Sequence, residues 1–266
     1  MGFDFDFSRI SVPFRMQPGL ARLPAGAPQL TPLAPGNALH AEKQAVLLAG
    51  LSRHCSPGFD PSSAIESIAE FARQTCTAGT FDSKTPLETA FEEDFAVLDG
   101  ATGTLPWLCV CVPSHWAPEE KVGLDFMTLH APVADNAALL AAAPRLVQLV
   151  TDGGRWERFV WTISPSGRFD QHPGRHPRAD WPDGADPQAF AAQCFLRAER
   201  QTFFPVGQGT RQAVFTIRVM LQPLTQAVDR PDKALRLHDS LASMSEAVLA
   251  YKGLAAARKP LLRWLA

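Results

Sequence analysis

Apolar residues recur at helical spacing in three stretches of the chain, each long enough for several turns. Ser62 or Ser63 can cap the first stretch, since short polar side chains accept hydrogen bonds from the free N–H groups of a first turn. Asp135 or Asn136 can cap the second in the same way, and Pro144 must kink that helix or restart it. The predicted helices are residues 61–75, 134–150 and 231–255.

Between these helices the pattern changes to short apolar runs and to alternation, which predicts strands. The turn signals GATG (100–103) and PVGQG (205–209) each join two of these runs, so each pair is expected to form a hairpin. Strands joined by short turns form antiparallel sheets on which helices pack, so the sequence predicts an α+β fold. The predicted strands are residues 91–99, 105–113, 154–164, 194–204 and 211–222.

One predicted strand carries an unusual row of polar side chains. With a period of two, Arg197, Glu199 and Gln201 project to the same side of the strand. On the neighbouring strand, Thr216 and Arg218 lie on the side opposite the apolar face. We predict a pocket that binds and orients a polar or charged group and is lined by Arg197, Glu199, Gln201 and Arg218. The alternative is a solvated face with cross-strand ion pairs, each worth under about 1 kcal/mol.

The bulk composition narrows the range of functions. The chain has 266 residues, 46% hydrophobic and 20% charged, with a net charge of -2. Such a charge gives no reason to expect nucleic acid or a membrane as a partner. No apolar run reaches the roughly 20 residues of a membrane span, and MGFDFDFSRI is not a secretory signal. We expect a cytoplasmic protein, with residues 1–266 forming one domain that includes a Pro-rich lead-in of about residues 1–40 and a C-terminal helix.

The five cysteines argue against a disulfide framework and against a cysteine zinc site, because their number is odd and no CxxC pair occurs. Cys109 and Cys111 are expected to point to the same face of a strand as buried free thiols. No GxGxxG, P-loop or GxSxG motif is present, so nucleotide binding and serine-nucleophile catalysis have no support. The chain also lacks iron–sulfur and flavin motifs, so an oxidoreductase of this sequence takes its electrons from another chain.

His130 differs from the other histidines because it ends the apolar run LDFMTLH. Read as a strand, this run places Phe126, Thr128 and His130 on one face, and Pro132 then turns the chain. An imidazole at the edge of an apolar wall suits an axial haem ligand, which is a neutral nitrogen donor facing a dry, flat cavity. The alternative is a structural histidine that binds backbone groups in a loop.

Five blocks of the sequence, taken in order, resemble the haem-dependent oxidative N-demethylase alpha-subunit-like family. The most specific are VPSHWAPEEKVGLDFMTLHAPV and the strand RAERQT. Together the blocks span most of the chain: they are residues 13–23, 92–98, 112–133, 158–164 and 195–224.

The resemblance implies a PAS-like antiparallel sheet packed with helices and enclosing haem b. It implies that His130 is the iron ligand, and that Arg197, Gln201 and Arg218 bind the cofactor. It assigns Glu199 and Arg197 to catalysis. The implied monooxygenase reaction removes a methyl group from a small amine such as dimethylamine, with dioxygen as co-substrate and formaldehyde as product. Electrons would come from an external flavin and iron–sulfur reductase, and a folate-dependent subunit would receive the formaldehyde.

Two other functions stay open at this point: a non-catalytic haem-binding or gas-sensing PAS-like protein, and a haem-free module that binds a small metabolite. The sequence also departs from the family pattern at Val160 in RFVWTIS and at Ala134 in HAPVA. The single tyrosine, Tyr251, falls in the last predicted helix, so no tyrosine is expected in the pocket.

Overall fold

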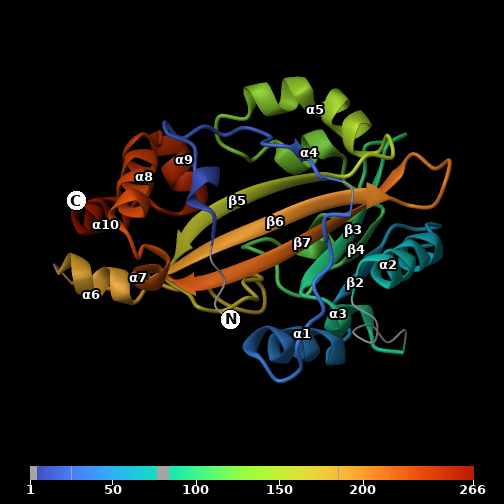
Figure 1. The fold of residues 1–266 in the computed structure, drawn as a ribbon, viewed down its shortest axis with the longest axis horizontal. Helices are drawn as coiled ribbons and strands as arrows, with labels where there is room; N and C mark the ends of the chain where they lie inside the picture. The colour runs from blue at the N-terminus through green and yellow to red at the C-terminus, as the bar shows by residue number, and fades with distance from the viewer. Residues whose placement is uncertain (1–4, 25, 77–83, 185) are drawn as a thin grey trace.

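An antiparallel sheet forms the centre of the molecule. The computed structural model describes residues 5–24, 26–76, 84–184 and 186–266. These residues form a seven-stranded sheet in the order β1-β5-β6-β7-β3-β4-β2, with every neighbouring pair antiparallel (Figure 1). The strands are β1 (Ala21–Arg22), β2 (Arg53–Cys55), β3 (Glu93–Asp99), β4 (Trp107–Cys109), β5 (Trp156–Ser164), β6 (Phe195–Pro205) and β7 (Gln212–Pro223).

Helices surround this sheet, so the predicted α+β class is confirmed. Figure 1 shows α6 to α10 gathered at one end of the long strands, α1 to α3 on the side of the short strands β2 to β4, and α4 and α5 beside β5. The helices of the described residues are α1 (Ala38–Leu48), α2 (Ser62–Thr75), α3 (Leu87–Ala90), α4 (Phe126–His130), α5 (Ala137–Val150), α6 (Pro187–Ala192), α7 (Leu224–Ala227), α8 (Pro231–Ala242), α9 (Glu246–Lys252) and α10 (Arg258–Leu265). Short 3-10 helices lie at Phe7–Arg9 and Pro118–Glu120.

Both predicted hairpins are confirmed. β3 pairs with β4, and β6 pairs with β7 along their whole length. The first turn is stabilised by Asp99, whose Oδ1 accepts hydrogen bonds from the backbone N–H groups of Ala101 and Thr102. Gly103 closes this turn at φ +73°, a conformation that glycine adopts without a steric penalty.

Successive residues of a strand point to opposite faces, so we name the two faces after neighbours on β6: the Glu199 face and the Arg200 face. The C-terminal helices α8 to α10 pack on the Arg200 face around Leu196 and Ala198. At the other end of the sheet α2 covers the same face, and Phe71 stacks on Phe204 with ring centroids 4.5 Å apart. This face is therefore closed by helices at both ends.

The Glu199 face is covered differently. Val150, at the end of α5, packs against Leu98 and Phe203, and Trp116 and Val122 pack in the cluster that contains Leu108. The cover is thinner over the middle of β5 and β6. Side chains there are partly exposed, although β6 is a central strand. The fold thus leaves one part of a central sheet face available.

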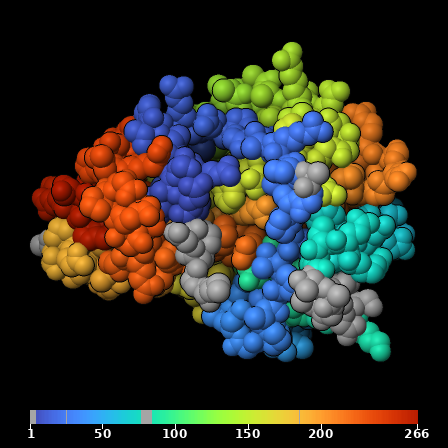
Figure 2. Space-filling model, viewed as in Figure 1, coloured from blue at the N-terminus to red at the C-terminus, as the bar shows by residue number. Residues whose placement is uncertain are grey.

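The N-terminal segment lies over the domain with little regular structure before α1, as its prolines predict. Figure 2 shows it, in blue, crossing the surface between the C-terminal helices and α2. It is fastened to the sheet by the pairing of β1 with β5, and by Gln29, whose Nε2 donates to the carbonyl of Phe203 at 2.9 Å.

The prediction of one continuous helix over 231–255 is wrong, although most of the range is helical. The chain forms two helices there, α8 and α9, and α10 follows. The break comes at Ser245, whose Oγ accepts a hydrogen bond from the N–H of Val248 at 3.2 Å and so begins a new helix. A serine inside an apolar repeat can compete with the backbone for hydrogen bonds, and here it ends the repeat.

The predicted capping hydrogen bonds do not form, although Asn136 does occupy the N-cap position of α5, one of the two positions predicted for that helix. Helix α2 begins after Pro61, and the carboxylate of Asp60 accepts the N–H of Ser62 at 3.0 Å. Helix α5 has no side-chain cap. Asn136 instead donates to the carbonyls of His130 and Ala131, so it joins α5 to the preceding segment. Helix α5 continues through Pro144 and does not restart there.

All five cysteines are free thiols, and Cys109 and Cys111 are buried, as predicted. They do not share a face, because β4 ends at Cys109 and the two thiols pack in different clusters. No helix of the described ranges has the length and apolar character needed to cross a membrane.

Candidate functional site

His130 lies at the end of a helix, which corrects the strand predicted for LDFMTLH. Asp125 begins this helix, α4, because its Oδ1 accepts the N–H groups of Met127 and Thr128 at 2.8 and 3.0 Å. This N-cap outweighs the alternation of only seven residues. Phe126 and His130, four residues apart, consequently share one side of the helix, and their rings stack with centroids 4.0 Å apart.

The imidazole of His130 is held in one tautomer. Its Nδ1 lies 2.7 Å from the carbonyl oxygen of Phe126, and a carbonyl accepts hydrogen bonds, so Nδ1 carries the proton. Nε2 is then the nitrogen with a free lone pair. Burial lowers the pKa of His130, and the nearby charge of Arg158 adds to this effect. A neutral imidazole whose second nitrogen donates to a carbonyl is the form found in metal-ligating histidines.

Glu199 lies on β6 opposite Val160 of β5, on the part of the sheet that remains partly exposed. Each carboxylate oxygen has a donor: Ser114 Oγ donates to Oε1, and Gln201 Nε2 donates to Oε2 at 2.8 Å. Ser114 in turn accepts a hydrogen bond from Arg197 Nε at 2.8 Å. The structure therefore brings three of the predicted site residues together, with Ser114 linking Arg197 to Glu199.

Arg197 is directed into the protein. Its side chain is 1% exposed, and burial lowers its pKa to about 10. Besides Ser114, its guanidinium donates to the carbonyls of Arg168 and Phe169 at 3.1 and 2.9 Å. These bonds join β6 to two loops, so Arg197 positions the loops and the carboxylate of Glu199.

Arg218 does not join this group, which corrects the predicted four-residue pocket. It pairs across strands with Arg200, and so lies on the Arg200 face. There its guanidinium forms an ion pair with Glu92, with Nη2 and Oε2 2.6 Å apart. The sequence reasoning placed Arg218 on an adjacent strand correctly, but the register of the hairpin decides the face.

Three residues that the sequence reasoning missed lie near Glu199. Arg158 of β5 pairs with Gln201, on the Glu199 face. Burial and Arg158 lower the pKa of Lys252 to about 8, whereas Glu199 raises it. Burial and the charge of Glu199 raise the pKa of Tyr251, so the tyrosine not expected in the pocket lies within electrostatic reach of it. Only the folding of α9 against β5 brings these residues here, and no local motif signals it.

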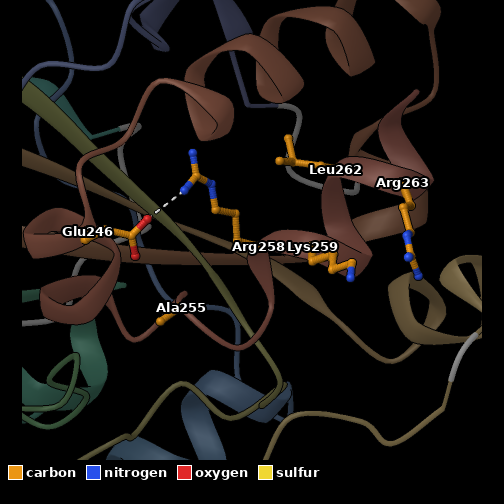
Figure 3. Close-up of a pocket in the computed structure, with 6 residues that line it drawn as sticks. All are labelled: Glu246, Ala255, Arg258, Lys259, Leu262 and Arg263. Carbon is orange, nitrogen blue, oxygen red and sulfur yellow. Dashed lines mark hydrogen bonds and ion pairs between the residues drawn. The ribbon is translucent and has the colours of Figure 1, made fainter.

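Two cavities of the structure lie elsewhere. The larger has a volume of about 530 Å³ on the C-terminal helices and contains an ion pair between Arg258 and Glu246 at 2.9 Å (Figure 3). It is lined by Glu246, Ala255, Arg258, Lys259, Leu262 and Arg263. The other, of about 370 Å³, lies beside Arg22 and Arg155. No predicted site residue lines either cavity.

The sequence profile of a known family, described as haem-dependent oxidative N-demethylase, alpha subunit-like, matches residues 66–262 of this chain. The chain belongs to this family. The match covers most of the chain and includes α4, β5, β6 and α9, the elements that bring His130, Arg158, Glu199 and Lys252 together. The family description implies haem-dependent oxidative demethylation of nitrogen and an alpha subunit within a larger enzyme.

The residues of this site fit a haem in two respects. His130 offers a neutral Nε2, and the porphyrin supplies the remaining nitrogen donors, so a single histidine suffices as protein ligand. Arg158 offers a buried Nε that has no hydrogen-bond partner in the described part of the chain. The same described residues contain no group of three or more His, Cys, Asp and Glu side chains that could hold a bare metal ion.

Proposed function

We propose that this protein is a haem-dependent monooxygenase that removes a methyl group from a small methylated amine, with His130 as the axial ligand of the iron. Family membership supports the reaction class. The observation that carries the assignment of the ligand is the hydrogen bond from His130 Nδ1 to the Phe126 carbonyl, which leaves Nε2 free. The sheet and α4 would enclose the haem in the manner of a PAS domain.

Glu199 is proposed to bind the amine. Both of its oxygens accept a hydrogen bond from uncharged donors, Ser114 and Gln201, so the carboxylate has a fixed orientation. A small ammonium group gains most from such a partly buried carboxylate, because the interaction is poorly screened by water. Gln201 and Arg197 are positioning residues in this scheme, and Arg197 acts through Ser114.

The bound haem would supply the iron that activates dioxygen. In the overall reaction one oxygen atom of dioxygen goes to the methyl carbon, which leaves as formaldehyde, and the other becomes water. Two electrons and two protons complete the balance, and the amine loses its methyl group. The electrons are proposed to come from a separate flavin and iron–sulfur reductase, and a folate-dependent subunit is proposed to receive the formaldehyde.

The first test is the visible spectrum of the protein expressed with a supply of haem. We expect a Soret band in the wild type and its loss or shift in His130→Ala. His130→Gly should recover the band when free imidazole is added, because imidazole can occupy the vacated position. His238→Ala is the matched control and should leave the spectrum unchanged, since His238 contacts its neighbour Asp239 on α8, away from this site.

A wild type that shows no Soret band after reconstitution with haem would contradict the proposed function. If the band is present, the purified protein is given dimethylamine, dioxygen and a chemical reductant, and formaldehyde is measured. Formaldehyde that depends on Glu199 supports the demethylase. Haem binding without any formaldehyde from methylated amines leaves a haem-binding or gas-sensing protein and contradicts the enzyme.

A further inference from the structure

Arg158 is an unusual arginine in the centre of this fold. It lies on β5, opposite Gln201 of β6, on the Glu199 face. Its Nε is fully buried and has no hydrogen-bond partner in the described part of the chain. Leaving a buried donor of a charged group unsatisfied costs more than leaving a neutral one, so such an atom calls for an explanation.

The other arginines of the three long strands all have partners. Arg197 donates to backbone carbonyls of two loops and to Ser114. Arg200 forms an ion pair with Glu157 at 3.0 Å, and Arg218 forms one with Glu92. The chain thus satisfies its buried guanidinium groups wherever their role is structural, and Arg158 is the exception on these strands.

No carboxylate of the described residues forms a hydrogen bond with Arg158 either. The carboxylate that influences it most is Glu199, whose oxygens are engaged by Ser114 and Gln201. The other basic group close by, Lys252, has its own partner, since its Nζ donates to the carbonyl of Trp161 at 2.7 Å. Arg158 therefore has no carboxylate of its own among the described residues, and a bound anionic group would take that position.

We propose that Arg158 binds a carboxylate carried by a ligand of this site. The guanidinium of arginine matches a carboxylate with parallel hydrogen bonds, and Nε is one of the donors of that fork. Two ligands can bring the carboxylate: a propionate of haem, or a substrate that is an N-methylated amino acid. The choice between these ligands rests on the proposed function, whereas the observation that Nε has no partner in the described residues does not.

The test compares Arg158→Met with Arg200→Met, a matched control on the opposite face of the same sheet. In the apoprotein, Arg158→Met should raise the melting temperature by about 2–4 °C, because it removes a buried N–H donor of a charged group that has no partner in the described residues. Arg200→Met should not raise it, because it breaks the ion pair with Glu157. A melting temperature that falls as far in Arg158→Met as in the control would show that the donors of Arg158 already have partners within the apoprotein. Arg158 would then be a structural residue, and the proposal would be overturned.

Ligand titrations identify the source of the carboxylate. Haem is titrated by its Soret band, and haem dimethyl ester, which has no free propionate, is titrated in parallel. If the propionate is the partner, Arg158→Met weakens haem binding by about tenfold or more and leaves the ester unaffected. If the substrate carboxylate is the partner, haem binding is unchanged, and the binding of N-methylglycine, followed by calorimetry, is lost in the variant.

Equal affinities of wild type and Arg158→Met for all three ligands would overturn the inference, even if the His130-dependent Soret band is present. A wild type that binds no haem contradicts the proposed function instead. In that case the binding of N-methylglycine to the apoprotein decides the inference. Binding to the wild type that is lost in Arg158→Met supports a carboxylate site. A wild type that does not bind N-methylglycine contradicts such a site.

Discussion

Single buried acids in this protein differ in what surrounds them. Glu88 is 1% exposed and accepts hydrogen bonds from Ser52 and from two nitrogens of Arg53. Glu93 is also 1% exposed, but only its Oε2 has a donor, the N–H of Thr31 at 2.9 Å, and Oε1 has none in the described residues. Burial alone raises the pKa of a carboxyl, and only Glu88 has enough donors to reverse this effect.

These environments predict that the contributions of Glu93 and Glu88 to stability depend on pH in opposite directions. Burial raises the pKa of Glu93 above 4.5, so its contribution to stability is present below that pH and is lost as the pH rises through the folded pKa. We expect Glu93→Gln to increase the free energy of unfolding by about 1–2 kcal/mol at pH 7 and by little at pH 4. Urea unfolding at the two pH values measures the difference.

Glu88→Gln is the control with the opposite sign. For Glu88 burial raises the pKa most, but the hydrogen bonds from Arg53 and Ser52 outweigh it, and the net pKa is lowered. Its stabilising contribution is therefore present above the unfolded value and is lost as the pH falls through the folded pKa. Glu88→Gln should destabilise the protein at pH 7. Equal responses of the two variants would contradict this account of the buried acids.

At the scale of elements, the orientation of His130 depends on one short helix. Helix α4 has only five residues, and such a short helix is not stable by itself in water. It is held at its start by Asp125 and after its end by Asn136, which donates to the carbonyls of His130 and Ala131 at 3.0 and 2.9 Å. The position of the proposed iron ligand thus depends on side chains outside the helix.

Asp125→Ala should therefore weaken α4 while leaving the proposed ligand His130 in place. Loss of the N-cap should lower the free energy of unfolding, because two N–H groups of the first turn lose their acceptor. The weaker helix holds His130 less firmly, so haem affinity followed by the Soret band should fall although His130 is intact. Asp125→Asn keeps a capping oxygen and should retain most of the stability and most of the haem affinity of the wild type. A haem affinity that is the same in all three proteins would show that α4 does not position the ligand.

At the scale of the whole molecule, Arg197 connects parts that are far apart in the sequence. Its guanidinium lies at the meeting point of β6, the loop at Val112–Ser114 and the loop at Arg168–Phe169. The carbonyls of these loops cannot bond to each other, so a buried cation with several donors is the group that satisfies them together. The same bonds hold Ser114 against Glu199.

Arg197→Met should therefore cost about 3 kcal/mol or more in the free energy of unfolding, because several buried carbonyls lose their donor at once. Arg200→Met, which removes a partly exposed ion pair from the opposite face of the same strand, should cost under about 1 kcal/mol. Guanidinium unfolding of both variants checks this. Similar costs would indicate that Arg197 has no special part in holding the loops.

The sequence by itself was sufficient for the elements whose signals are local. The β3–β4 and β6–β7 hairpins follow from turn residues between apolar runs, and the row Arg197, Glu199 and Gln201 on one face follows from the period of a strand. Family membership also followed from the sequence, because motifs such as VPSHWAPEEKVGLDF and RAERQT are contiguous.

Only the tertiary structure decided which residues meet. Hairpin register moved Arg218 to the Arg200 face, although its strand was predicted correctly. A single N-cap turned the run ending at His130 from a strand into a helix, because seven residues carry too little periodicity to outweigh two capping hydrogen bonds. Arg158 and Lys252 are 94 positions apart in the sequence, and only the packing of α9 against β5 brings their charges together. Long-range electrostatics depends on distance in space, and the sequence records only distance along the chain.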